Sequence, residues 1–386
     1  MLPFDTLLTF IKGNGMKKLL ICTLMVLLIP SFLFAQSKGQ TKIQLSILLD
    51  TSSSMDGLID QAKSQLWAII NELARAQKNQ KDAILELSLY EYGNDRLPMK
   101  DGYIRNVVPF TTDVDLISEK LFELTTNGGS EHCPQVVVRS LDEMKWSTSN
   151  DDLRLIIIAG NEEFQQGPIT TAIACKRAKE MDVYVNTIFC GNFNQGKNIG
   201  WDNLSTCTNA AYNNIDMDKK FEAIATPYDD ELATLNGSIN KTYVWYGEEG
   251  KVQEARQMKQ DDNSSKYGSA NLAERAATKS NATLYNYSRA DLVDAIKNDP
   301  TVLDKLKKEE LPKELQGKSK EQITKELEKS SVERTAMQKK IAELSTQRKK
   351  FIDEKRKDLV AESSLEQALN KAIKKQATKS GFVFKN

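Results

Sequence analysis

Three oxygen-bearing side chains stand at alternate positions directly after an apolar run. In the segment SILLDTSSSM these are Asp50, Ser52 and Ser54. One carboxylate and two hydroxyls are hard ligands of modest charge, which suit Mg²⁺, Ca²⁺ or Mn²⁺ and leave coordination positions open for water or a partner. The pattern therefore predicts a divalent-cation site in the loop that begins at residue 50.

The elements that must position this loop are visible as apolar runs that alternate with amphipathic segments from residue 41 to about residue 227. Several runs are apolar on successive residues, as expected of strands covered on both faces. The runs are KIQLSILLD, ILELSLYEYG, YIRNVVPF, LRLIIIAG and VYVNTIFCG, and the helix-like segments are 58–76, 114–124, 135–144 and 169–181. This order predicts an α/β fold with a doubly wound, mostly parallel, Rossmann-like sheet that binds ligands beyond the carboxyl ends of its strands.

Motif and element order together resemble the von Willebrand factor type A (VWA) domain over about residues 40–220. That family's metal-ion-dependent adhesion site (MIDAS) takes D-x-S-x-S from a first loop, a threonine from a second and an aspartate after the fourth strand. Asp50, Ser52 and Ser54 match the first element. The resemblance implies that the two serines contact the metal, that the aspartate acts largely through water, and that the open position accepts a carboxylate of a protein ligand.

The second loop, TTNGGSEHCP, has Ser130 at the place of the family's threonine. Thr125 or Thr126 would take that place if the loop were registered earlier. Glu131 is a further alternative, and its carboxylate would occupy the coordination position that is usually reserved for a ligand.

The third element departs further from the family, because its aspartate falls at Gly160 or Asn161 and neither is anionic. Asn161 can still offer a carbonyl oxygen or orient a coordinating water. The loss of a negative charge should lower cation affinity unless Glu131 or Glu162 compensates. A degenerate site kept as a structural loop is the alternative.

The first 35 residues have the features of a secretory signal: Met16-Lys17-Lys18, an apolar run over 19–35, and a polar start at Gln36. They predict export to the periplasm or cell envelope. The alternative is an uncleaved N-terminal anchor helix, for which the 17-residue run with Pro30 is near the lower limit of length. Several strings, among them GGSEHCPQVV, IIIAGNEEFQQGP and LNGSINKTYVWYG, are similar to a bacterial, envelope-associated subgroup of VWA proteins.

Residues 228–386 are rich in Lys, Glu, Gln and Ala, and are predicted to form a helical C-terminal region after a VWA domain over 40–227. Met337, Ile341, Leu344 and Phe351 form a heptad-like stripe that is interrupted by Arg348. One long helix or a helical hairpin is expected. It would pack on its own neighbours, or pair with another chain as a coiled coil.

The 53 basic and 53 acidic residues cancel over the whole chain but not within its parts. Residues 301–386 carry a net charge of +8 and residues 36–300 about −10. Without a global positive field or aromatic side chains among the basic ones, nucleic acid is not an expected partner. The alternating charges of the last 86 residues favour a solvated helix surface, with envelope association as the alternative.

The chain has one histidine, His132, which leaves little room for histidine-based zinc or triad chemistry. Adjacent side chains rarely point at one another, so a nucleophilic pair with Cys133 is not expected. Export would permit one or two disulfides, whose pairing the spacing leaves open, among Cys133, Cys175, Cys190 and Cys207.

These features predict an exported, non-enzymatic adhesion or scaffold module that binds an acidic side chain of a protein partner through a divalent cation. The predicted metal ligands are Asp50, Ser52, Ser54, Ser130 and Asn161, with Glu131 and Glu162 as secondary candidates. The alternative is a structural envelope scaffold with a degenerate metal site, in which the basic C-terminal helices carry the association.

Overall fold

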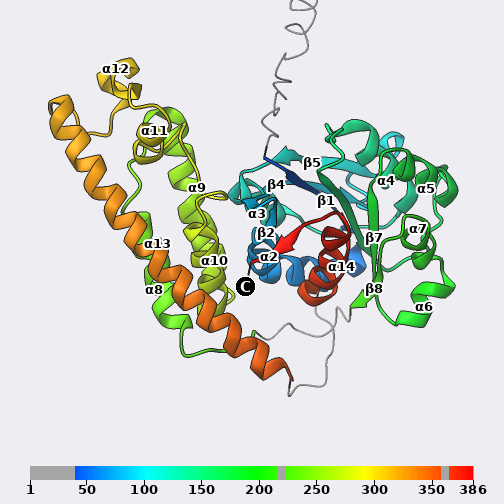
Figure 1. Cartoon of the computed structure of the whole chain (residues 1–386). Coiled ribbons are helices and arrows are strands. Elements are labelled where there is room, and N and C mark those ends of the chain that lie inside the picture. The colour runs from blue at the N-terminus through cyan, green and yellow to red at the C-terminus, as the bar shows by residue number, and fades with distance from the viewer. Residues whose placement is uncertain (1–39, 216–222, 358–364, 386) are drawn as a thin grey trace, which may run out of the picture. The chain divides into compact units, whose positions relative to one another are not determined.

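The computed structural model describes residues 40–215, 223–357 and 365–385 (Figure 1). The predicted signal peptide therefore lies outside the described residues. Within the described part of the chain, no helix is long and apolar enough to cross a membrane.

A six-stranded sheet forms the centre of the first part of the chain, and its strand order is β5-β4-β1-β6-β7-β8. All neighbouring strands run parallel except β5, which is antiparallel to β4 at the edge. The prediction of a doubly wound, mostly parallel sheet is confirmed. The strands are β1 (Lys42–Asp50), β4 (Ile84–Tyr92), β5 (Ile104–Thr111), β6 (Leu153–Gly160), β7 (Tyr184–Cys190) and β8 (Tyr212–Ile215).

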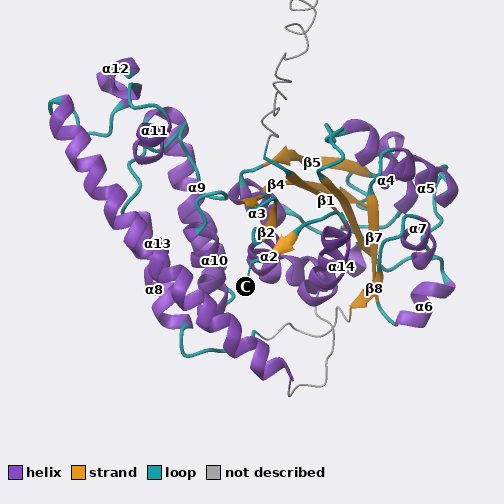
Figure 2. Ribbon diagram, in the orientation of Figure 1, coloured by secondary structure: helices purple, strands orange, loops and turns teal. Residues whose placement is uncertain are grey.

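Helices cover both faces of this sheet (Figure 2). One core cluster joins alternate residues of β1, such as Leu45 and Leu49, to α2 and α3. A second cluster joins Leu48, which points to the opposite face, to α4, α5 and α7. The bounds are α2 (Asp56–Leu73), α3 (Val114–Glu123), α4 (Cys133–Glu143), α5 (Thr171–Glu180), α6 (Phe193–Asn198) and α7 (Trp201–Cys207).

The register brings the carboxyl ends of three strands to one level. Asp50, the last residue of β1, pairs with Tyr92 at the end of β4, and Leu49 pairs with Ala159 of β6. The loops that follow these three strands consequently meet at one edge of the sheet.

The helical region is confirmed, and its longest element is the 38-residue α13. Ile341 and Leu344 pack in one cluster with residues of α8 and α10. Arg348, at which the sequence predicted an interruption of the apolar stripe, is buried and pairs with Asp229 at 2.7 Å and with Glu274. The helices are α8 (Asp229–Asn240), α9 (Gly247–Ser265), α10 (Ser269–Ser280), α11 (Leu292–Asn298), α12 (Val302–Lys305) and α13 (Lys320–Lys357).

The end of the chain returns to the sheet, whereas the sequence placed all of 228–386 in one helical region. Helix α14 (Leu365–Lys379) contacts α2 and β8, and the two-residue strand β9 (Val383–Phe384) pairs with β2 (Ala76–Lys78), which also pairs with β3 (Lys81–Asp82). The buried amides of Asn186 and Gln376 bond to each other at 2.6 and 3.0 Å. This segment is thus part of the sheet domain.

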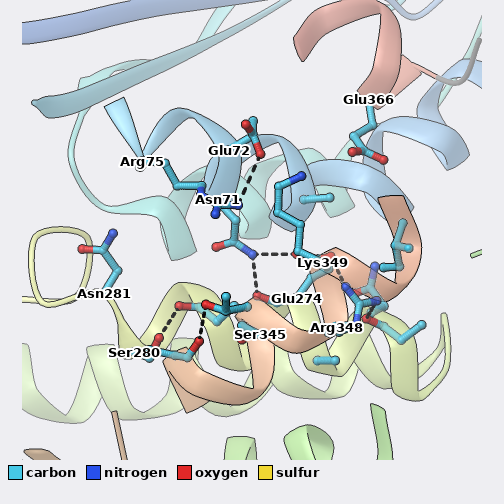
Figure 3. Close-up of a pocket in the computed structure, with 18 of the residues that line it drawn as sticks. Asn71, Glu72, Arg75, Glu274, Ser280, Asn281, Ser345, Arg348, Lys349 and Glu366 are labelled. Atoms are coloured by element: carbon cyan, nitrogen blue, oxygen red, sulfur yellow. Dashed lines mark hydrogen bonds and ion pairs between the residues drawn. The ribbon is translucent and has the colours of Figure 1, made fainter. Parts of the chain in front are cut away.

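A cavity of about 540 Å³ lies between α2, α10 and α13. Its lining is mixed in charge and rich in side-chain amides and hydroxyls (Figure 3). Asn71 of α2 donates to Glu274 of α10 at 2.8 Å, and Glu274 in turn accepts from Arg348 of α13. This polar chain of contacts links the three helices.

Candidate metal centre

Asp50 ends the central strand, and its fully buried carboxylate lies between the ends of β4 and β6. Its Oδ1 accepts the backbone N–H of Ser52 at 2.8 Å. Its Oδ2 is buried and has no hydrogen-bond partner within the described part of the chain. A buried carboxylate oxygen without a partner is costly, so this atom marks a place where a cation fits.

The two serines of the motif and Asn161 form a chain of side-chain contacts. The hydroxyls of Ser52 and Ser54 are 3.3 Å apart. The Oγ of Ser54 lies 3.2 Å from Oδ1 and 3.0 Å from Nδ2 of Asn161. Ser52 is buried and Ser54 is exposed, so one residue of the pair lies in the interior and the other at the surface.

The second loop is fixed to the first by its backbone. The N–H of Ser53 donates to the carbonyl of Gly128 at 2.8 Å, and the N–H of Asn127 donates to the carbonyl of Thr51 at 3.0 Å. Ser130 follows these contacts and is half-buried. The side chain of the next residue, Glu131, is 5% exposed and accepts a hydrogen bond from Ser52.

The two threonines considered as alternatives are engaged elsewhere. Thr126 donates to Asp56 at 2.5 Å, and Thr125 accepts a long bond of 3.5 Å from Arg96. Of the second-loop acids and hydroxyls, Glu131 accepts a hydrogen bond from Ser52 and lies near Asp50, and Ser130 stays a predicted ligand.

The third loop has no room for an aspartate at position 160. A Cβ atom on Gly160 would lie 2.9 Å from Oδ2 of Asp50 and 2.6 Å from the hydroxyl of Tyr92. That hydroxyl donates to the carbonyl of Ala159 at 2.9 Å. Glu162, the other acid considered on this loop, is exposed.

The electrostatics of the site favour a cation. Burial raises the pKa of Asp50 to about 7; hydrogen bonds from Ser52 oppose this shift, and the charges of Glu131 and Glu162 add to it. The pKa of Glu131 is also raised, first by burial and then by the charge of Glu162. Two buried carboxylates that repel each other are stabilised by a shared positive ion.

The residues present thus fit a hard divalent ion, which would be held by Asp50, Ser52, Ser54 and Glu131. Among the described residues, no group of three or more His, Cys, Asp or Glu side chains could hold a metal. A site here would accordingly depend on hydroxyls as well as carboxylates, as in the predicted motif.

The cysteines divide into one disulfide and two free thiols. Cys175 of α5 is bonded to Cys207 of α7. Cys133 and Cys190 are free and buried, and burial raises the pKa of both thiols. The nearest polar contact of the Cys133 thiol is the hydroxyl of Tyr92, at 3.7 Å, whereas His132 contacts Gln135.

We expect alkylation of Cys133 and Cys190 by iodoacetamide only after unfolding, because a buried neutral thiol is neither accessible nor nucleophilic. In denaturant without reductant, peptide mass mapping should find both residues modified and the Cys175–Cys207 pair intact. Labelling of Cys133 in the native protein would contradict this result.

Comparison with known proteins gives similarity in structure only. No protein-family model matches the chain, and no curated protein matches it. Proximal thread matrix protein 1 of the mussel byssus, solved with a zinc-occupied MIDAS motif, shares 12% identity over 47% of this chain and 43% of its own, with a TM-score of 0.37. A von Willebrand factor type A structure from Catenulispora acidiphila shares 15% identity over 46% of this chain and 40% of its own, with a TM-score of 0.34.

A third structure, of an aerotolerance-related membrane protein from Bacteroides fragilis, shares 14% identity over 45% of this chain and 92% of its own, with a TM-score of 0.32. The chain spans less than half the length of the first two structures. In this chain itself, the central strand ends in D-x-S-x-S and the sheet has one antiparallel edge strand. The sheet domain has a VWA-type fold. The D-x-S-x-S loop follows the central strand β1 at the edge of the sheet where β4 and β6 also end.

Proposed function

We propose that this protein is an exported, non-enzymatic binding module that engages a carboxylate of a protein partner through a divalent cation. The observation that carries the proposal is the buried Oδ2 of Asp50, which has no hydrogen-bond partner among the described residues and belongs to the same motif as the paired hydroxyls of Ser52 and Ser54. Because Ser54 is exposed, an ion held there has a side open to a partner. The cation supplies the positive charge, and the motif residues orient it.

The first test is calorimetric titration with Mg²⁺, Ca²⁺ and Mn²⁺. The wild-type protein should bind at least one of them with millimolar or tighter affinity, and Asp50→Ala should abolish the binding because the buried carboxylate is lost. Ser53→Ala is the matched control: Ser53 stands between the two motif serines, is exposed, and should leave the affinity unchanged. Equal binding by wild type and Asp50→Ala would contradict the proposal.

Capture of envelope proteins with and without chelator then tests the cation bridge itself. Retention of a partner should be lost with chelator and with Asp50→Ala. Capture that is indifferent to both would instead favour the second candidate function.

The second candidate is a structural envelope scaffold with a degenerate site. It is favoured by the absence of an acid at Gly160 and Asn161, and by the exposed lysines Lys371, Lys375 and Lys379 along one face of α14. A protein of this kind would bind no divalent cation in the titration. Its association with the envelope would weaken at high salt rather than with chelator.

A further inference from the structure

The carboxylate of Glu131 accepts a hydrogen bond from Ser52 of the D-x-S-x-S motif. We infer that Glu131, on the second loop, supplies the second anionic ligand of the cation site and replaces an acid on the third loop. This inference rests on the proposed function, since it concerns the same ion.

Glycines at two positions of the neighbouring loops leave space for the Glu131 side chain. A Cβ atom on Gly129 would lie 2.5 Å from its Oε1, and one on Gly93 would lie 3.1 Å from its Cγ. The same position on Gly93 is 2.7 Å from Oδ1 of Asp50. Two residues without side chains thus leave room for the carboxylate beside Ser52 and Asp50.

Burial distinguishes Glu131 from the other acids nearby. Its side chain is 5% exposed, and it accepts from Ser52 and, at 3.5 Å, from Nε2 of Gln166. Glu162 and Glu163 follow the third strand and are exposed. A buried carboxylate next to a second one, Asp50, needs a counter-charge, whereas the charge of an exposed carboxylate is stabilised by hydration.

The two carboxylate oxygens of Asp50 have different surroundings. Its Oδ2 faces Gly160, where no acid fits, while its Oδ1 faces Gly93 on the side of Glu131. The second charge therefore comes from Glu131 on the loop before α4, rather than from the loop after β6. A cation held by Ser52, Ser54 and Glu131 would be close to two carboxylates, those of Asp50 and Glu131, which strengthens the binding of a hard divalent ion.

Titration of Mn²⁺ into Glu131→Gln tests the assignment, with the magnetic resonance signal of free Mn²⁺ as a second readout. The variant should bind at least about tenfold more weakly than wild type, since even indirect partners of a metal ligand are worth that much. Glu163→Gln is the matched control, because it removes an exposed charge from the third loop and should leave the affinity unchanged.

Asn161→Asp in the Glu131→Gln background supplies a rescue. Position 161 already lies within 3.2 Å of the Ser54 hydroxyl, so a carboxylate there restores the second charge and should recover most of the affinity. Circular dichroism and the melting temperature in the absence of metal establish that each variant is folded.

The outcomes separate this inference from the proposed function. If wild type and Glu131→Gln bind Mn²⁺ equally and Asp50→Ala does not, the role of Glu131 is overturned and the cation site stands. If wild type binds no divalent ion, the proposed function fails and the inference fails with it. Weakening in Glu131→Gln alone, with recovery by Asn161→Asp, supports the assignment.

Discussion

Replacing Asp115 by alanine should lower the free energy of unfolding by about 3–5 kcal/mol, because it leaves a buried positive charge without its main partner. Arg275 of α10 is fully buried. Its two terminal nitrogens contact both oxygens of Asp115, at 2.5 and 3.0 Å. Asp115 lies in the first turn of α3, so this pair joins the helical region to a helix that covers the sheet.

The remaining groups around Arg275 cannot replace the lost charge. Asp261 lies 3.0 Å from Nε of Arg275, but it also lies 2.6 Å from the buried ammonium of Lys279. Removal of Asp115 leaves two buried cations facing one carboxylate. The ring of Trp67, 4.4 Å from the guanidinium carbon, adds a cation–π contact that is weaker than an ion pair in such a setting.

Urea unfolding followed by circular dichroism measures the effect. Glu248→Ala, which removes an exposed partner of Lys251 at 2.6 Å, is the control and should cost less than about 1 kcal/mol. The double variant Asp115→Leu with Arg275→Met should recover most of the lost stability, since it leaves no unpaired charge in the interior. A loss below about 1 kcal/mol in Asp115→Ala would mean that water reaches Arg275.

The sequence predicted the strands and helices that have a long apolar run or a clear amphipathic pattern. The run LRLIIIAG is buried at every residue of β6, and the predicted helix over 114–124 differs by one residue from α3. Continuous apolar runs of this length are typical of central parallel strands, and they placed Asp50 at a strand end. By contrast, β8 is a four-residue strand with two asparagines, and β9 has two residues, so neither carries a periodic signal.

Non-local pairing explains the errors in the helical region. Arg348 reads as a break in an apolar stripe, but its acidic partners Asp229 and Glu274 lie 119 and 74 positions away in the chain. When the charge of an arginine is paired with acidic residues that are distant in the sequence, the methylene groups of its side chain can pack like those of an apolar residue. Only the folded chain shows that Arg348 is buried and paired.

The candidate site was predictable in its first loop and ambiguous in the others. D-x-S-x-S has a fixed spacing after a strand, so its three side chains share one loop. The second loop offered several oxygen donors in a row, and its register depends on backbone bonds from Ser53 and Asn127 to distant residues. The burial of Glu131, which separates it from Ser130 and Glu162, is likewise a property of the fold.

The C-terminal helix α14 contributes a buried side chain, Ile373, to the core of the sheet domain. Ile373→Ala should lower the free energy of unfolding by about 2–5 kcal/mol, since it empties space in a close-packed core. The side chain of Ile373 is 1% exposed and lies in the same cluster as Leu45 of β1 and Ile70 of α2. An amphipathic helix alone does not reveal which surface it covers, and the sequence therefore predicted only that this segment belongs to a helical C-terminal region.

Lys375→Ala on the same helix is the matched control, because Lys375 is exposed and its loss should change stability by no more than about 0.5 kcal/mol. Unfolding should be followed by near-ultraviolet circular dichroism, which reports on the buried tryptophans of both faces of the sheet, Trp67 on the α14 side and Trp201 on the opposite side. If Ile373→Ala shifts this signal to lower urea, α14 stabilises the whole sheet domain. If it leaves the transition unchanged, the last helix does not stabilise the sheet domain. In that case the predicted end of the domain at residue 227 holds.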